Sequence, residues 1–327
     1  KNPKINLGIK VKSNLLEVDL DIDGIKREEL MEVFTAYEKK KKFVKLESGN
    51  FLKITDEFLE SINNLKVGLE ISNESILNND ILIDKNHSFY IDYILKENNA
   101  YKIATDEKFV SYIENIKNMK SQVFPIPKNL NAELRSYQVD GFNKLMNMKS
   151  NGFGMILADD MGLGKTIQII SLLLGVVGSG KPSLITCPSS LILNWKKELN
   201  NFAPTLKVLT LNQDGENRRV LFDEINSYDV IVTSYELLKR DSELYDGFEF
   251  ENFILDEAQY IKNSNTQNFL TSKKVKSKTK IALTGTPIEN SLSELWSIMD
   301  FVAPGYLSTY KSFNKKFEVP IVIEENS

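Results

Sequence analysis

The chain has 327 residues, of which 42% are hydrophobic and 26% charged, and its formal net charge is −4. This composition is ordinary for a globular protein of two or more domains, and it excludes binding to nucleic acid through overall basic charge, so any polyanion site must be local. The only cysteine, Cys187, and the only histidine, His87, exclude an intramolecular disulfide, a cysteine-built zinc site and a histidine cluster. No apolar run reaches the length of a membrane span, and we expect a cytoplasmic protein.

Residues 1–125 are predicted to form a small α+β accessory domain. The segment 14–25, NLLEVDLDIDGI, alternates apolar and acidic residues, which predicts a strand with one buried face. The other predicted elements are a helix and then a short strand within 26–46, and amphipathic helices at 57–65 and 109–119. This part holds no catalytic constellation, and residues 121–134, which contain two prolines, are predicted to be a connector.

From residue 126 to 327, short apolar strands alternate with helical patterns. The predicted strands are 154–158, 183–187, 207–211, 229–234, 252–257 and 280–285. The predicted helices are 135–149, 165–177, 189–202, 216–225 and 290–301. This alternation predicts an α/β fold with a doubly wound, mostly parallel sheet, in which ligands bind at the carboxyl ends of the strands.

The segment 158–166, ADDMGLGKT, lies between a predicted strand and a predicted helix, which is the context of a phosphate-binding loop. Gly162 and Gly164 would allow a sharp turn whose N–H groups, with the start of the helix, point at phosphate oxygens. Lys165 would reach the β- and γ-phosphates, and Thr166 would bind Mg²⁺. A glycine-rich connector that binds nothing is the alternative. The residues predicted to surround the phosphates are Asp160, Met161, Gly162, Leu163, Gly164, Lys165 and Thr166.

The segment 253–259, FILDEAQ, is an apolar strand that ends in two adjacent carboxylates. Asp256 could hold Mg²⁺, and Glu257 could orient or deprotonate the attacking water, whereas a solvated turn is the alternative. A phosphate loop followed by such a strand is rare by chance. The two motifs together therefore predict a Mg²⁺-dependent nucleoside triphosphatase.

A third motif, LTGTP at 283–287, ends another predicted strand. The hydroxyls of Thr284 and Thr286 can hydrogen-bond to the carboxylate loop and to whatever binds at the strand ends. With Gly285 between them, these residues are predicted to couple the two sites. A tight turn explains so short a string equally well.

Six segments, in this order, resemble the first motor lobe of the Swi/Snf family, the DNA-translocating ATPases of helicase superfamily two. They are LRSYQ (134–138), ADDMGLGKT (158–166), CPSSLILNWKKEL (187–199), TSYELL (233–238), LDEAQYIKN (255–263) and LTGTPIENSLSELWSIMDFVAPGYL (283–307). The resemblance implies a RecA-like lobe over residues 126–327, and it includes Asp159, because that family has an acidic stretch where other phosphate loops have glycine. Gln259 stands where many relatives have histidine, and we expect it to bond to the γ-phosphate or water and to preserve activity.

By the same resemblance, Gln138 would contact the adenine edge and Arg135 would lie near the nucleotide, so ATP with Mg²⁺ is expected. Two segments match the family's strand-tracking motifs, which implies sequence-independent, salt-sensitive contacts to the backbone of duplex DNA. The candidate residues are Ser189, Ser190, Thr233, Ser234, Tyr235, Lys262 and Asn263. The two serines could equally cap a helix. Trp195 is expected in the core, and the lysine-rich segment 273–280 is either a solvated helix end or a DNA-facing edge.

The resemblance implies part of a bacterial, nucleoid-associated ATPase that translocates on duplex DNA and remodels protein–DNA complexes. The second lobe, with its arginine fingers, is expected to lie outside this chain, so the isolated chain should hydrolyse ATP weakly. Residues 1–125 resemble, less specifically, the accessory domain that precedes the motor in bacterial members. The alternatives are a strand-separating DNA or RNA helicase of the same superfamily and a docking module in which ATP binding only positions a partner. No membrane or oligomeric partner is expected.

Overall fold

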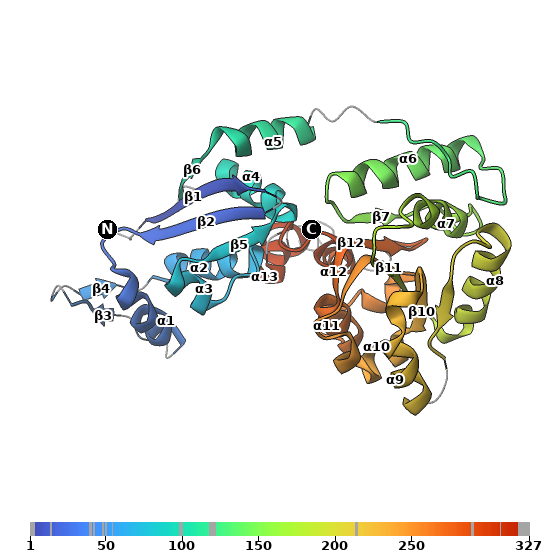
Figure 1. Cartoon of the computed structure of the whole chain (residues 1–327). Helices are drawn as coiled ribbons and strands as arrows, with labels where there is room; N and C mark the ends of the chain where they lie inside the picture. Colours follow the sequence, from blue (N-terminus) through green and yellow to red (C-terminus); the bar gives the residue numbers. More distant parts are fainter. Residues whose placement is uncertain are drawn as a thin grey trace. The chain divides into compact units, whose positions relative to one another are not determined.

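The computed structural model describes residues 4–13, 15–38, 41, 43–47, 49, 51–53, 55–97, 101–117, 122–212, 215–288, 291–307 and 309–319. The chain divides into two compact units, shown in Figure 1. Unit 1 comprises Lys1–Met119 together with Pro304–Pro320, and unit 2 comprises Lys120–Ala303. The sequence analysis expected two consecutive domains that meet at 125/126. It did not anticipate that residues 304–320 belong to the N-terminal unit. Within the described ranges, no helix is both long enough and apolar enough to cross a membrane.

Unit 2 is built on a six-stranded sheet in the order β7-β12-β11-β8-β10-β9, and every neighbouring pair is parallel. Its strands are β7 (Met155–Leu157), β8 (Ser183–Cys187), β9 (Val208–Thr210), β10 (Val230–Ser234), β11 (Glu249–Leu255) and β12 (Lys276–Leu283). All residues of β8 and β10 are buried, because helices cover both faces of the sheet. The predicted doubly wound α/β fold is confirmed, and each strand corresponds to a predicted one.

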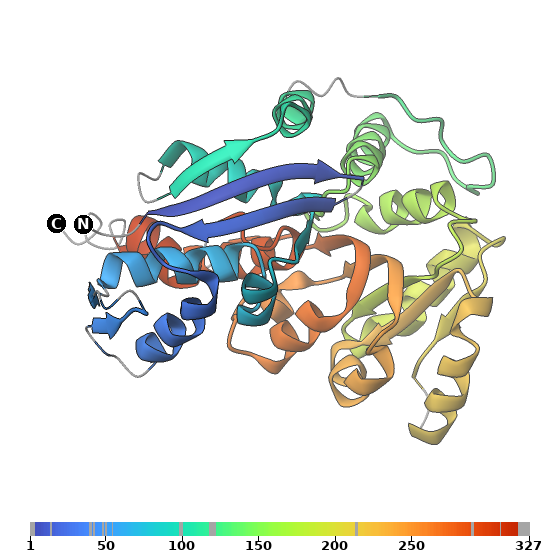
Figure 2. The ribbon, with the colours of Figure 1, turned by 60° about the vertical axis from the view of Figure 1, so that its left-hand side comes forward.

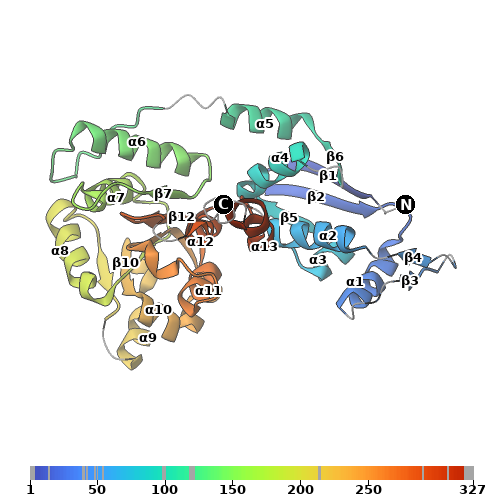
Figure 3. The same ribbon diagram turned by 180° about the vertical axis from the view of Figure 1, so that it is seen from behind.

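The helices of unit 2 form two layers, one on each face of the sheet (Figures 1 and 3). They are α6 (Ser136–Ser150), α7 (Lys165–Gly175), α8 (Ile192–Phe202), α9 (Gly215–Asp223), α10 (Tyr235–Arg240), α11 (Gln267–Lys274) and α12 (Leu292–Val302). The helices α6, α7 and α8 cover one face and α9 to α12 the other, as right-handed crossovers between parallel strands require. The short helices α10 and α11 were not predicted, because six to eight residues are too few to show a repeating apolar pattern.

Unit 1 contains a four-stranded mixed sheet in the order β5-β2-β1-β6 and a separate hairpin of β3 and β4. Its strands are β1 (Ile5–Lys12), β2 (Leu15–Ile22), β3 (Phe43–Lys45), β4 (Phe51–Lys53), β5 (Ile81–Asp84) and β6 (Tyr101–Thr105). Its helices are α1 (Leu30–Glu38), α2 (Asp56–Gly68), α3 (Asn73–Asn78), α4 (Ser88–Glu97) and α5 (Glu107–Lys117), with α13 (Tyr310–Phe313) from the returning segment. The predicted strand at 14–25 is β2, and the predicted α+β class of this part is confirmed.

His87 is buried in unit 1, and its Nδ1 lies 3.0 Å from the carbonyl oxygen of Gly68. The described residues contain no group of three or more His, Cys, Asp or Glu side chains that could hold a metal ion. This histidine therefore contributes to packing, as its isolation in the sequence indicates.

The returning segment 304–320 packs among the helices of unit 1, where Figure 2 shows it in red beside the blue α2. Thr309 Oγ1 lies 3.2 Å from Asn64 Oδ1 of α2, and the ring of Tyr306 meets that of Phe89 edge-on at 5.6 Å. Gly305 has a φ of 75°, and a Cβ there would lie 2.0 Å from the carbonyl oxygen of Gly68. Only glycine fits this close approach of two backbones.

Candidate active site and nucleic-acid interface

The three predicted motifs meet at the carboxyl edge of the sheet of unit 2. Leu157 at the end of β7 pairs with Leu283 at the end of β12, and Ala282 pairs with Leu255 at the end of β11. The phosphate loop, the Thr284–Thr286 segment and the carboxylate pair therefore leave three neighbouring strands at one edge. This is where a parallel sheet binds its ligands.

The phosphate loop turns through two glycines with left-handed backbone, Gly162 at φ 82° and Gly164 at φ 77°. Lys165 begins α7, and its ammonium donates to the carbonyl oxygens of Asp159 at 2.6 Å and Asp160 at 3.2 Å. The positive charge is thus held inside the turn at the start of a helix, the arrangement that favours a bound anion.

Asp159, the residue that departs from the usual loop pattern, anchors the loop to α7. Its Oδ2 accepts a hydrogen bond of 2.8 Å from the side-chain amide of Gln168, which is fully buried. A glycine at 159 would lack this bond. The side chain of Asp159 therefore fixes the start of the loop. The main-chain carbonyl of the same residue accepts the hydrogen bond from Lys165. Gln168 was not singled out in the sequence, because a buried polar residue in an apolar run shows its partner only in the fold.

The carboxylate pair follows β11, and its two members have different surroundings. Asp256 Oδ2 accepts the indole N–H of Trp195 at 2.8 Å, and Oδ1 accepts the main-chain N–H of Glu257 at 3.0 Å. Burial raises the pKa of Asp256; the Trp195 hydrogen bond opposes this shift, and the nearby Glu257 charge adds to it. Glu257 has a φ of 52°, a conformation that costs a non-glycine residue about 1–3 kcal/mol and that is concentrated at active sites.

A hydrogen-bonded chain joins the carboxylate loop to the third motif. Gln259 donates from Nε2 to Glu257 Oε2 at 2.6 Å, and its Oε1 lies 3.5 Å from the hydroxyl of Thr284. Thr284 in turn accepts the main-chain N–H of Thr286 at 3.1 Å. A Cβ on Gly285 would lie 3.2 Å from Met161 Cγ, so this segment also contacts the phosphate loop. Of the contacts expected of Thr284, the one to the carboxylate loop is present and runs through Gln259.

The start of α6 is bonded to the phosphate loop. Gln138 accepts the main-chain N–H of Arg135 at 2.9 Å and donates to the carbonyl of Leu163 at 3.2 Å. Tyr137, which the sequence analysis did not select, donates its hydroxyl to the same carbonyl at 3.1 Å. Arg135 is exposed. Gln138, predicted to contact the adenine edge, and Arg135, predicted to lie near the nucleotide, are thus at the start of a helix that is bonded to the loop predicted to hold the phosphates.

The candidate DNA contacts differ in exposure. Ser189 and Ser190 are exposed in the 3-10 turn Ser189–Leu191 that follows β8. The side chains of Thr233, Ser234 and Tyr235 are buried, and Ser234 caps α10 by accepting the N–H of Leu237 at 3.2 Å. Lys262 pairs with Glu294 at 3.1 Å, and Asn263 is exposed in the loop before α11. Trp195 is 2% exposed, which confirms its predicted place in the core.

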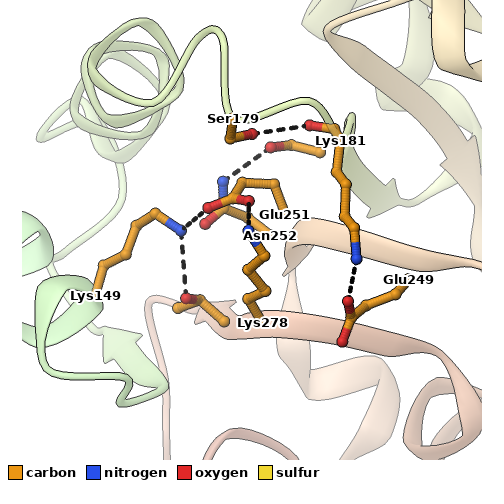
Figure 4. A network of polar contacts seen from close by, with 9 residues as sticks. Lys149, Ser179, Lys181, Glu249, Glu251, Asn252 and Lys278 are labelled. Atoms are coloured by element: carbon orange, nitrogen blue, oxygen red, sulfur yellow. Dashed lines mark hydrogen bonds and ion pairs between the residues drawn. The ribbon is translucent and has the colours of Figure 1, made fainter. Parts of the chain in front are cut away.

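The lysine-rich segment 273–280 ends α11 and begins β12, at the edge opposite the phosphate loop. Lys278 and Lys149 both pair with the buried Glu251, at 2.8 and 2.7 Å, in the network of Figure 4. Lys273 pairs with Asp300 of α12 at 2.8 Å. The Lys278 pair joins β12 to β11, and the Lys273 pair joins α11 to α12. The sequence analysis considered only a solvated helix end or a DNA-facing edge for this segment.

Two family models match the chain, the SNF2-related domain over residues 137–327 and the bacterial SNF2 helicase-associated domain over residues 1–127. The chain belongs to the SNF2 family. The resemblance drawn from the six sequence segments is thereby confirmed, and so is that of residues 1–125 to the accessory domain of bacterial members.

Relatives of this SNF2 chain are much longer proteins. An uncharacterised ATP-dependent helicase from Mycoplasma genitalium is 33% identical over 315 residues, which cover 95% of this chain and 30% of that protein. A putative ATP-dependent helicase/translocase from Bacillus subtilis is 43% identical over 202 residues, which cover 60% of this chain and 22% of that protein. The SWI2/SNF2 ATPase core of Sulfolobus solfataricus, solved in complex with double-stranded DNA, has a TM-score of 0.57 and 43% identity, covering 62% of this chain and 42% of that one.

The donor set at the strand ends fits the ATP and Mg²⁺ that the SNF2 family uses. Asp256 and Thr166 supply carboxylate and hydroxyl oxygens, the ligand type that Mg²⁺ prefers. Each carboxylate oxygen of Asp256 accepts one hydrogen bond, from Trp195 or from Glu257, and so retains a lone pair for the ion or for its water.

Proposed function

We propose that this chain is the ATP-binding first motor lobe of an SNF2-type ATPase that translocates on duplex DNA and remodels protein–DNA complexes. The observation that carries the proposal is Glu257, whose backbone has a positive φ and whose carboxylate is bonded to Gln259 beside Asp256, at the same edge as the phosphate loop. A protein that only bound nucleotide would not need a second carboxylate in this position. The 43% identity to an ATPase core solved with double-stranded DNA supports duplex DNA as the polymer.

The roles of the site residues follow from their positions. Lys165 neutralises the β- and γ-phosphates from inside the turn, and the N–H groups at the start of α7 bind phosphate oxygens. Mg²⁺, held by Asp256 and Thr166, would neutralise charge that develops on the phosphates. Glu257 takes the proton of the attacking water. ATP is selected over other nucleotides by Gln138 with Arg135 at the start of α6.

Contact with the DNA backbone is proposed for Ser189 and Ser190, with Lys262 and Asn263. The two serines are exposed hydroxyls at the carboxyl edge of β8, and such groups bind phosphate without reading sequence. Thr233, Ser234 and Tyr235 are buried. This part of the proposal therefore keeps the exposed Ser189, Ser190 and Asn263, together with Lys262, whose ammonium would have to leave Glu294 to reach DNA. Binding should weaken as salt rises, because phosphate contacts release counterions.

Completion of the site is assigned to a second lobe with arginine fingers, which are worth about 10³–10⁵ in rate in phosphoryl transfer. The isolated chain should therefore bind ATP weakly and turn it over poorly. We place the full protein in the bacterial cytoplasm at the nucleoid, with residues 1–125 as an accessory domain of the motor.

The test is ATP turnover by the full-length protein without polymer and with duplex DNA, single-stranded DNA or RNA, compared side by side. Strong stimulation by duplex DNA, absent in the isolated chain, is the expected result. Preference for single strands or RNA would replace the proposal by a strand-separating helicase. Turnover that ignores every polymer would favour a nucleotide-gated docking module.

A further inference from the structure

Two aromatic side chains from different segments converge on Asp256. The indole N–H of Trp195 donates to the carboxylate at 2.8 Å, and the hydroxyl of Tyr235 donates to the main-chain carbonyl of the same residue at 2.9 Å. Trp195 is 2% exposed and Tyr235 1% exposed. One aspartate at a strand end thus accepts one side-chain and one main-chain hydrogen bond from buried aromatic donors.

Each donor belongs to a segment that leaves a different strand. Trp195 lies on α8, directly after the 3-10 turn that carries Ser189 and Ser190, and this turn follows β8. Tyr235 begins α10, directly after β10. In the sheet, β8 lies between β11 and β10, so Tyr235 reaches across one strand to Asp256. Both segments are therefore joined to the carboxylate by side chains as well as by the sheet.

The loop that carries Asp256 and Glu257 also contacts the start of α10 through two stacked tyrosine rings. The rings of Tyr235 and Tyr260 lie 5.0 Å apart and within 8° of parallel, and Tyr260 donates its main-chain N–H to the carbonyl of Glu257 at 3.1 Å. A shift of α10 would move Tyr235, and with it the main-chain carbonyl of Asp256 and the turn that holds Glu257. The indole of Trp195 has only one hydrogen-bond donor, its N–H. A shift of α8 would therefore break the hydrogen bond from Trp195 to Asp256 with no second donor to replace it.

We propose that Trp195 and Tyr235 are positioning residues that hold Asp256 for its metal and transmit DNA contact at the exposed turn after β8, which carries Ser189 and Ser190, to the ATP site. The coupling part rests on the proposed function, whereas the positioning of Asp256 does not require DNA. Loss of a partner that orients a metal-binding carboxylate commonly costs 10–100-fold in metal affinity or activity, and we expect each donor to act in this range.

The test replaces each donor by phenylalanine in the full-length protein. Trp195→Phe and Tyr235→Phe keep an aromatic ring in the core and remove the N–H or O–H. The first readout is nucleotide binding, followed with a fluorescent ATP analogue while Mg²⁺ is titrated, without DNA. We expect the Mg²⁺ concentration at half-saturation to rise about 10–100-fold, while binding without Mg²⁺ is unchanged. The second readout compares DNA affinity with DNA-stimulated ATP turnover in the same variants. We expect each variant to bind DNA as the parent does but to show less stimulation of turnover by DNA.

Matched controls come from the same residue types away from the site. Trp296→Phe removes the other tryptophan, which is buried on α12, and Tyr90→Phe removes a buried hydroxyl that donates to Asn64 in unit 1. Both should leave the Mg²⁺ titration and the stimulation as in the parent. If Trp195→Phe and Tyr235→Phe leave the Mg²⁺ dependence unchanged, the positioning role is wrong. This holds also if the two variants unfold at a lower temperature than the parent.

Failure of the proposed function gives a different pattern. If the parent protein shows no stimulation by any polymer, the coupling falls together with the proposed function. The Mg²⁺ titration still decides whether the two donors position Asp256. If the parent is stimulated and both variants retain full stimulation, the coupling is wrong and the proposed function stands.

Discussion

ATP turnover by the full-length protein with duplex DNA is expected to fall about 10²–10⁴-fold when Glu257 is replaced by glutamine. Glutamine has nearly the same shape, and its carbonyl can still accept the 2.6 Å hydrogen bond from Gln259. It cannot take a proton from the attacking water. Steady-state phosphate release measures the loss, and titration with a fluorescent ATP analogue should show unchanged nucleotide binding.

Glu224→Gln is the matched control, because this glutamate is exposed beyond the end of α9 and should be silent. A docking module would behave differently, since its partner binding would survive Glu257→Gln with no turnover to lose. Parental turnover in Glu257→Gln would contradict the assignment of the base and leave the strained backbone at 257 unexplained.

Replacing Glu251 by alanine is expected to lower the free energy of unfolding of unit 2 by about 3–5 kcal/mol, the cost of breaking a buried ion pair on one side. Glu251 is 5% exposed and forms ion pairs with Lys149 and Lys278 at 2.7 and 2.8 Å. Burial lowers the pKa of Lys149, and Glu251 offsets only part of this shift. Without Glu251 the Lys149 ammonium would be buried and uncompensated. Denaturant unfolding followed by a probe in unit 2 measures the loss.

The control lies on the same strand. Glu249 pairs with Lys181 at the surface, so Glu249→Ala should cost only about 0–1 kcal/mol. Equal losses for the two variants would contradict the buried network as the cause.

The effect of Glu251 should also depend on pH. Burial by itself raises the pKa of Glu251, but the bonds and charges of Lys149 and Lys278 outweigh it and hold the pKa below its usual value. A carboxylate with a lowered pKa stabilises the fold above its unfolded pKa, and this contribution is lost as pH falls through the folded value. The gap between parent and Glu251→Ala should therefore narrow in acid, and a gap that widened there would reverse the assigned sign.

The fold of unit 2 could be predicted well because its strands are short apolar runs. Its loops also carry combinations of residue types that few folds place together. What could not be predicted is what depends on meeting in space. Trp195 has the pattern of a core residue, and nothing local shows that its N–H points at Asp256. The Asp159–Gln168 bond depends on how the phosphate loop turns into α7, and the Glu251 network joins residues of α6, β11 and β12 that only the fold brings together. In unit 1, the strands β1, β4, β5 and β6 were not predicted. For β6 the reason is that its partner, β1, is distant in the sequence.

The return of residues 304–320 to unit 1 makes that unit a discontinuous domain, with unit 2 inserted into it. A cut after Met119 therefore does not separate two complete folds. The N-terminal product would lack the partners of Phe89, Asn64 and Gly68, and the other product would carry Tyr306 and the buried Phe313 with nothing to cover them. Each product would expose apolar surface of the kind that drives aggregation. A fragment meant to carry the motor lobe alone is better ended at Ala303, and one meant to carry the accessory unit needs residues 304–320 restored.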